Sequence, residues 1–260
     1  MFSTYSTSII CALGFTGNLL NILLLTNLRI FRGNRCAFYL ITESIINLGQ
    51  LFQFLFYEIW ASKHNGKDLM NASSIGCKLR NILPQWFRLM LASIICFVAI
   101  DQYLSTNPLP YLRQWSSLKL AHRQIYFASS LCLFHIIPSA IYLEISPSLG
   151  CIITNNNLVN YYSFFYYPVL SGLLPIFISS LFSLLAYRNV RRIVRRQIPI
   201  DRRKLDQQLT AMVFVRVIFF AQLQLPYTIY QIYLLNRVIV NVYTLEHSIL
   251  EWIETISVAL

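Results

Sequence analysis

Long hydrophobic runs separated by short polar segments dominate the chain. The runs lie at about 8–28, 37–61, 82–104, 124–145, 160–187, 207–235 and 246–260. Most of them are near or above the roughly 20 residues that a helix needs to cross a bilayer. The pattern predicts an all-α membrane protein with a single domain over residues 1–260, built as a bundle of seven transmembrane helices.

The last hydrophobic run is shorter than the others. Its fifteen residues, from Glu246 to Leu260, rise only about 22 Å as a helix, and three glutamates lie within the first nine. We therefore expect the seventh helix to be incomplete in this sequence, as it would be in a C-terminally truncated fragment.

Composition agrees with a membrane protein. Apolar residues make up 56% of the chain and charged residues 12%, with a mean hydropathy of +0.54, whereas soluble domains carry about 25% charged residues. The basic segment from Arg188 to Lys204 lies between two runs, contains Pro199 and lacks the interleaved aromatic residues that stack on bases. It favours anionic lipid at the inner face of the membrane over nucleic acid, so no nucleic-acid partner is predicted.

The distribution of positive charge predicts the orientation. With the N-terminus outside, five cations fall in outer segments, and a larger group falls in cytoplasmic ones. The fourteen cytoplasmic cations are Arg29, Arg32, Arg35, Arg113, Lys119, Arg123, Arg188, Arg191, Arg192, Arg195, Arg196, Arg202, Arg203 and Lys204. This is the positive-inside pattern of multi-pass proteins, and it places the N-terminus outside the cell.

Under this orientation, Cys77 and Cys151 are the two of six cysteines that face the oxidising compartment. Cys77 also lies 24 residues before Asp101, a helical rise of roughly 36 Å that carries the chain across the membrane. We predict a disulfide between Cys77 and Cys151. The four histidines are scattered with no zinc-like spacing, so no metal or cofactor is predicted. No nucleophile is paired with a base, so the chain is not expected to be an enzyme.

An ordered set of residues resembles the rhodopsin-like (class A) G-protein-coupled receptors. The matching residues are Gly17, Asn18, Cys77, Asp101, Tyr103, Cys151, Pro175, Asp206, Phe220, Pro226 and Tyr227, and Asn47 falls where the second helix of the family usually carries an aspartate. The resemblance runs over nearly the whole chain but is divergent. Gln102 stands where the family has an arginine, Gln224 replaces a tryptophan, and Ser183 replaces a tyrosine.

The resemblance implies a plasma-membrane receptor that binds an extracellular ligand and signals to a heterotrimeric G protein. It implies roles in activation and coupling for Asp101, Gln102, Tyr103 and Asp206, and roles inside the membrane for Asn18, Asn47, Pro175, Phe220 and Pro226. Prolines within spans free backbone carbonyls, so Pro175 and Pro226 mark places where a cavity or hinge is expected. The change at Gln102 keeps open an alternative, a receptor-like protein that binds a ligand or partner but couples poorly. A transporter is a more remote alternative, because the chain shows no repeated halves.

Polar residues in the outer half of the predicted bundle form the candidate ligand site: Glu58, Gln85, Arg88, Gln224, Tyr227 and Gln231. The last three share one helical face, and polar groups inside a span normally face the bundle interior. Arg88 needs an anion, either Glu58 or a ligand carboxylate. Peptide and small acidic ligands both remain open. Tyr161, Tyr162, Tyr166 and Tyr167 favour a peptide, although they are equally typical of an interfacial aromatic belt.

Two further charges, Glu43 and Arg216, lie deep in apolar runs. An isolated charge at that depth costs about 2.5–3.5 kcal/mol on insertion scales, so two opposite charges are easier to accommodate as a pair. We predict that Glu43 and Arg216 form an ion pair between the second and sixth helices. The alternative is that Arg216 extends to the inner headgroups while Glu43 is protonated.

Overall fold

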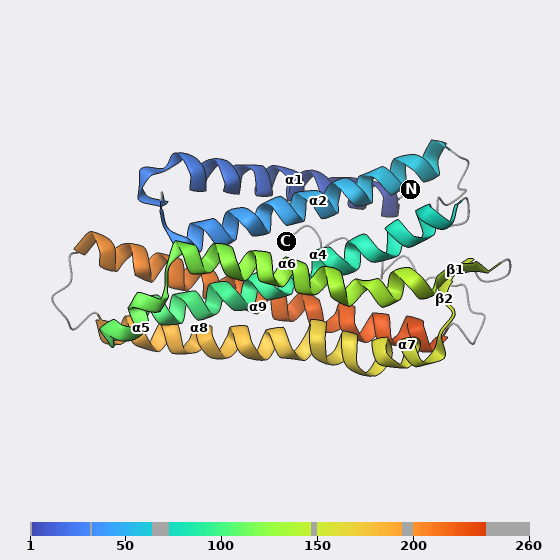
Figure 1. Cartoon of the computed structure of the whole chain (residues 1–260). Helices are drawn as coiled ribbons and strands as arrows, with labels where there is room; N and C mark the ends of the chain where they lie inside the picture. Colours follow the sequence, from blue (N-terminus) through green and yellow to red (C-terminus); the bar gives the residue numbers. More distant parts are fainter. Residues whose placement is uncertain (1, 32, 64–72, 147–149, 194–199, 238–260) are drawn as a thin grey trace.

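The computed structural model describes residues 2–31, 33–63, 73–146, 150–193 and 200–237, and these residues are almost entirely helical. The helices are α1 (Phe2–Asn27), η1 (Arg29–Phe31), α2 (Arg35–Lys63), α4 (Ser74–Thr106), α5 (Pro110–Trp115), α6 (Leu118–Tyr142), α7 (Asn156–Tyr161), η2 (Tyr162–Leu173), α8 (Leu174–Ile193) and α9 (Ile200–Arg237). Two short strands, β1 (Leu143–Ser146) and β2 (Gly150–Ile153), complete the described fold. The long helices lie side by side along one axis (Figure 1).

Within the described residues, five helical stretches are long and apolar enough to cross a membrane. They are Ser8–Asn27, Ser74–Thr106, Leu118–Tyr142, Asn156–Arg191 and Gln207–Tyr233. Helix α2 is also long, with 29 residues, but it is not among them. It carries the buried polar residues Glu43, Ser44, Asn47 and Gln50. The described part of the chain is thus nearly all-helical with membrane-like helices, and the predicted seventh helix at 246–260 lies outside it.

The predicted span at 124–145 ends three residues too late. Helix α6 stops at Tyr142, and the chain continues as strand β1, which pairs antiparallel with β2. The Tyr142 carbonyl accepts hydrogen bonds from the backbone N–H and the hydroxyl of Thr154, which closes the base of this hairpin. Hydrophobicity continues through Leu143 and Ile145, and the sequence pattern therefore gave no sign of the change from helix to strand.

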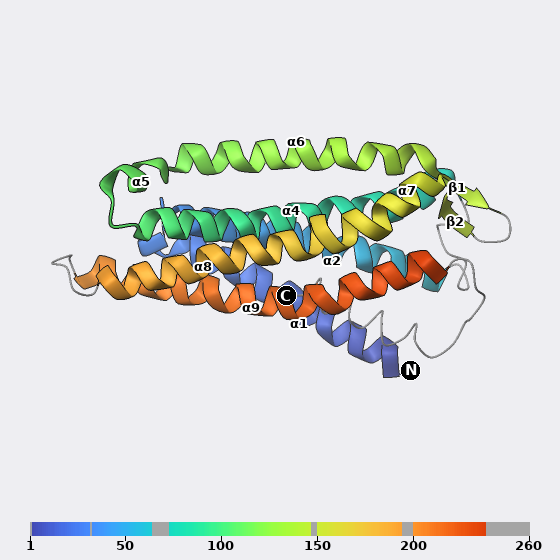
Figure 2. The ribbon, with the colours of Figure 1, turned by 90° about the horizontal axis from the view of Figure 1, so that it is seen from below.

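Helix α4 occupies the centre of the described bundle. It contacts α2, α6, α8 and α9, while α1 packs on α2. Figure 2 shows α6 on one side of α4 and the pair α8 and α9 on the other. Buried side chains of α4, among them Leu89, Met90, Ile94 and Val98, form much of the hydrophobic core with residues of α2, α6 and α9. The central helix can therefore carry functional side chains toward several neighbours.

The segment between α7 and α8 is a π-helix of 12 residues, η2. Such wide turns are rare and occur frequently at functional sites. Pro168 lies inside the element, and its missing N–H removes a helical donor. Near its end, a Cβ atom on Gly172 would lie 2.8 Å from the Tyr167 carbonyl oxygen and 3.1 Å from the Thr228 hydroxyl. Glycine at this position therefore permits the close approach of η2 to α9.

Candidate functional site

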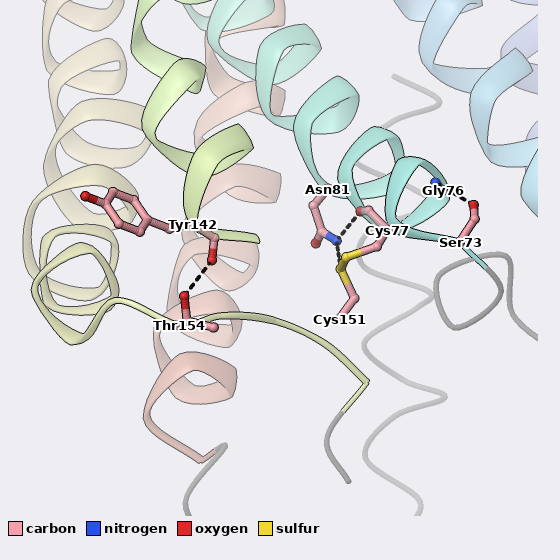
Figure 3. Close-up of a disulfide and its surroundings, with 7 residues drawn as sticks. All are labelled: Ser73, Gly76, Cys77, Asn81, Tyr142, Cys151 and Thr154. Carbon is pink, nitrogen blue, oxygen red and sulfur yellow. Dashed lines mark hydrogen bonds between the residues drawn. A yellow bond between two sulfur atoms is a disulfide. The ribbon is translucent and has the colours of Figure 1, made fainter. Parts of the chain in front are cut away.

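A disulfide joins Cys77 in the first turn of α4 to Cys151 in strand β2, with Cα atoms 5.6 Å apart. The Asn81 side chain donates hydrogen bonds to the Cys77 carbonyl oxygen and, at 3.2 Å, to the Cys151 sulfur (Figure 3). The Ser73 hydroxyl caps the start of α4 by accepting from the Gly76 N–H. The predicted disulfide is confirmed. We call this end of the bundle the disulfide end.

The Arg216 guanidinium on α9 donates to the Glu43 carboxylate on α2, with Nη1 and Oε2 2.6 Å apart. The Glu43 side chain is 10% exposed and the Arg216 side chain 30%. The predicted contact between these charges is therefore present, and Arg216 does not extend away from Glu43. A short charge-assisted bond ties two helices whose residues lie 173 positions apart in the chain.

A cavity of about 280 Å³ lies between α2, α4 and α9. Its described lining contains a polar group of six residues and an apolar group of five. The polar residues are Glu43, Asn47, Gln50, Arg88, Arg216 and Gln224, and the apolar ones are Leu91, Ile95, Phe219, Phe220 and Leu223. The cavity thus brings together two predicted ligand residues, Arg88 and Gln224, with the ion pair and with Phe220 and Asn47.

Arg88 lies with its guanidinium carbon 3.7 Å from the centre of the Tyr227 ring. This close cation–π contact connects α4 to α9. Tyr227 is 2% exposed, so its phenol ring forms part of the bundle interior. Two candidate ligand residues are thus in contact; Arg88 lines the cavity, whereas Tyr227 is not among its described lining residues.

Gln224 has a specific backbone partner. Its amide Nε2 donates to the Ser171 carbonyl oxygen at 2.9 Å. In a regular helix this carbonyl would accept from the residue four positions later, which is Pro175 and has no N–H. Pro175 cannot serve as the α-helical donor to this carbonyl, and Gln224 supplies a donor from the neighbouring helix α9. This bond ties α9 to η2, while a cavity or hinge at Pro175 stays a prediction.

Replacing Gln224 with leucine is expected to reduce the free energy of unfolding by about 1–3 kcal/mol, because the buried Ser171 carbonyl would lose its donor. Gln222→Leu is a matched control, since Gln222 is exposed on the same helix. Both variants are compared by denaturant unfolding in bicelles. Equal losses in the two variants would show that the bond to Ser171 contributes little.

Gln85 belongs to a different polar cluster. It donates to the Tyr162 hydroxyl at 2.8 Å and accepts from the Ser139 hydroxyl at 3.2 Å. The Tyr162 and Ser139 hydroxyls also contact each other, and nearby His135 pairs with the Tyr161 hydroxyl at 2.9 Å. This cluster joins α4, α6, α7 and η2. Gln85 is not among the described residues that line the cavity.

Two tyrosines of the segment 161–167 pack in the interior of the bundle and do not line a route open to solvent. Tyr162 is 3% exposed and Tyr166 is 1% exposed, and the Tyr166 ring stacks on His135 with centroids 5.2 Å apart. Neither tyrosine therefore offers its face to a peptide at the surface or belongs to an interfacial belt. These two residues therefore no longer support a peptide ligand.

The remaining predicted ligand residues lie away from the described lining of the cavity. Glu58 is exposed on α2, and its charge acts on Cys11 of α1. Gln231 is partly buried near the end of α9. The suggested pairing of Glu58 with Arg88 stays a prediction. Pro226 lies inside α9 at an exposed position, and a hinge there stays a prediction.

Asn18 and Asn47 connect α1 to α2 next to the cavity. The Asn47 side chain donates to the Asn18 oxygen at 3.3 Å, and the Asn18 amide donates to the Gly14 carbonyl at 2.8 Å. About one helical turn after Asn18 on α1, Asn21 donates to the Ser44 hydroxyl on α2 at 3.1 Å. Buried polar groups therefore hold these two helices in register.

At the opposite end of α4 from the disulfide, Asp101 is 8% exposed and has two partners. Its carboxylate accepts from the Ser116 hydroxyl and lies 3.6 Å from Arg35 Nε. Arg35 also donates to the Ser116 carbonyl oxygen. The start of α2 and the turn after α5 are thus fixed to α4. We call this end of the bundle the Asp101 end.

Gln102 contacts α9 through an uncharged bond. Its amide donates to the Thr210 hydroxyl at 2.8 Å, and both side chains are 2% exposed. Tyr103 packs on Phe182 of α8, with ring centroids 5.5 Å apart. The side chain of Asp206, the predicted acidic partner, lies outside the described residues.

Sequence reasoning missed Arg35, Ser116, Thr210 and Gln50. Arg35 had been counted only as a cytoplasmic cation, although a basic residue near Asp101 could have suggested the pair. Thr210 lies one turn after Asp206, so helical spacing places it on the same face. Gln50 follows Asn47 by three residues and Glu43 by seven, a spacing that predicts one polar face on α2.

Among the described residues, no cluster of three or more histidine, cysteine, aspartate or glutamate side chains could hold a metal ion. No protein family profile matches the chain, and no curated protein matches it.

Proposed function

We propose that this chain is a rhodopsin-like G-protein-coupled receptor of the plasma membrane, with its N-terminus and its disulfide end outside the cell. It binds an extracellular ligand and signals to a cytosolic heterotrimeric G protein. The proposal is supported by the ordered sequence resemblance and by five helical stretches, within the described residues, that are long and apolar enough to cross a membrane.

The observation that carries the proposal is the cavity between α2, α4 and α9, bounded by the Glu43–Arg216 ion pair. A ligand in this cavity touches the contact that ties α9 to α2. Any ligand with different affinity for the paired and separated arrangements shifts the balance between them. Movement of α9 would change the Asp101 end, where Gln102 bonds to Thr210.

A second candidate function is a receptor-like membrane protein that binds a ligand or partner and couples poorly to G proteins. It is favoured by the bond between Gln102 and Thr210, because a neutral amide stands where the resemblance places an arginine. The two candidates share the cavity and differ at the Asp101 end.

Nucleotide exchange tests the proposal. The full chain is reconstituted in lipid nanodiscs with purified heterotrimers from the main G-protein classes, and exchange is compared with that of empty discs. A rate above that of empty discs supports coupling. Silence of the chain with every heterotrimer, both alone and with libraries of peptides and small acids, supports the second candidate.

Replacing Gln102 with arginine is expected to lower basal exchange. Arginine adds a charge that pairs with Asp101 or Asp206, so the resting arrangement is held more firmly. Gln114→Arg is the matched control, because Gln114 is exposed on the short helix α5. Equal, detectable basal rates for Gln102→Arg and the unmodified chain, at matched protein amounts, would contradict this expectation.

A further inference from the structure

We infer that an exposed surface on α5 and the first turns of α6 binds anionic phospholipids at the membrane–water interface. We call this surface the α5–α6 patch, and its residues are Leu109, Tyr111, Arg113, Trp115, Lys119 and Arg123. Lipid binding here needs only that α6 spans a membrane, so it is independent of the proposed receptor function.

The exposed face of α6 changes from cationic to apolar along its length. Lys119 and Arg123 are exposed, and helical spacing places them on the same face as the exposed residues Phe127, Phe134 and Ile141. Ile141 lies eighteen residues after Arg123, a rise of about 27 Å that is close to the roughly 30 Å of a hydrocarbon core. With the apolar part of this face in the hydrocarbon, both cations lie at the level of the lipid headgroups.

Helix α5 adds an aromatic pair beside these cations. Tyr111 and Trp115 are one helical turn apart, with ring centroids 6.1 Å from each other, and they are 63% and 58% exposed. Figure 2 shows α5 at the end of the bundle, directly before α6. Tyrosine and tryptophan are enriched at membrane–water interfaces because their rings are apolar and their tips are polar. The pair therefore fits the same headgroup level as Lys119.

The charge of the patch favours an anionic lipid over a zwitterionic one. Arg113, Lys119 and Arg123 are all positive, and the sequence between Asp101 and Glu144 contains no acidic residue. Each lysine or arginine near an anionic membrane surface strengthens binding by about fivefold. Phosphatidylserine carries the net negative charge that these cations attract, whereas phosphatidylcholine does not.

Hydrogen bonds fix both ends of α5, so the patch is a preformed surface. Before the helix, the Leu109 N–H donates to the Asn107 side-chain oxygen at 3.0 Å. After the helix, the Ser116 hydroxyl donates to Asp101, and the Ser116 carbonyl oxygen accepts from Arg35. These bonds hold the aromatic pair and the cations in place at the Asp101 end of the bundle.

Quenching of Trp115 fluorescence by brominated lipids tests the inference. The full chain is placed in phosphatidylcholine nanodiscs that contain increasing fractions of brominated phosphatidylserine or brominated phosphatidylcholine in both leaflets. The Trp115 signal is the difference between the unmodified chain and Trp115→Phe. We expect both lipids to quench it, with half-maximal quenching at an about 5- to 25-fold lower fraction of phosphatidylserine. The preference should fall as salt is added, because salt screens exposed charges.

Variants assign the preference to the cations of the patch. The triple change Arg113→Gln, Lys119→Gln and Arg123→Gln is expected to remove the preference for phosphatidylserine, while phosphatidylcholine still quenches Trp115. Replacing both arginines with lysine keeps the charge and should keep the preference. Lys78→Gln is the matched control, since Lys78 adjoins the disulfide at the other end of the bundle, and it should leave the preference unchanged.

Three results would overturn the inference: equal quenching by the two lipids, a preference that survives in the triple variant, or no quenching of Trp115 by either lipid. In the last case α5 faces water, and a change in Trp115 fluorescence on addition of a purified G-protein heterotrimer would assign the patch to a protein partner. Lipid quenching is read without nucleotide exchange, so failure of the receptor function leaves the lipid surface standing.

Discussion

Glu43→Gln and Arg216→Gln are each expected to lower the free energy of unfolding by about 3 kcal/mol. Removing one member of a buried pair leaves an uncompensated charge, which typically costs 3–5 kcal/mol. The lower end applies because the Arg216 side chain keeps 30% of its surface exposed. The double variant should lose much less than the sum of the two single losses. Unfolding of the three variants in bicelles gives the coupling energy.

The same variants test the role of the pair in signalling. If the pair holds α9 against α2 at rest, each single change should raise basal nucleotide exchange. Gln53→Leu provides a control on α2, because Gln53 lies ten residues beyond Glu43 and outside the described lining of the cavity. Strictly additive losses of stability, with unchanged basal exchange, would show that the contact between Glu43 and Arg216 has no energetic consequence.

Replacing both Cys77 and Cys151 with serine is expected to lower the free energy of unfolding by about 4 kcal/mol. The two residues are 74 positions apart, and the chain-entropy treatment of a loop of this length gives roughly that value. The loss should appear equally when the unmodified chain is reduced. Unfolding is followed with and without reductant.

Cys96→Ser serves as the control, because Cys96 is a free cysteine within the same helix. Reductant should change the stability of the Cys96 variant as it changes that of the unmodified chain, and it should leave the double serine variant unaffected. A double variant as stable as the oxidised chain would show that the bridge adds nothing to folding.

Hydrophobic periodicity and the cost of buried charge predicted the main helices and two specific contacts. Runs of apolar residues located the helices because a bilayer requires an uninterrupted apolar length. Cys77 and Cys151 could be paired because the charge pattern left them as the two cysteines outside. Glu43 and Arg216 could be paired because either charge alone is unfavourable at that depth.

The partners of the polar side chains could not be predicted in the same way. Gln224 was expected to face a ligand, and its inward direction followed from helical spacing. Its partner, the Ser171 carbonyl, depends on the local departure of η2 from α-helical geometry and on how closely α9 packs there. Sequence periodicity gives the direction of a side chain but not the distance to a neighbouring helix.

The aromatic segment shows a related limit. Tyr162 and Tyr166 have the composition of an interfacial belt, yet they are buried against His135 and Ser139. A π-helix changes the number of residues per turn, so the face assigned from an α-helical period is displaced. The position of Glu58 on an exposed part of α2 similarly depends on how that helix is rotated against α1 and α4.

Helix α4 is held at its two ends by bonds of different kinds. The disulfide at Cys77 is covalent, while the contacts of Asp101 with Arg35 and Ser116 are an ion pair and hydrogen bonds. Regions held by reversible contacts open locally at lower free energy than regions with a covalent link. Transient separation of α4 from its neighbours should therefore begin at the Asp101 end and stop before it reaches the bridge, so that local opening is concentrated in the half of the bundle that carries Asp101.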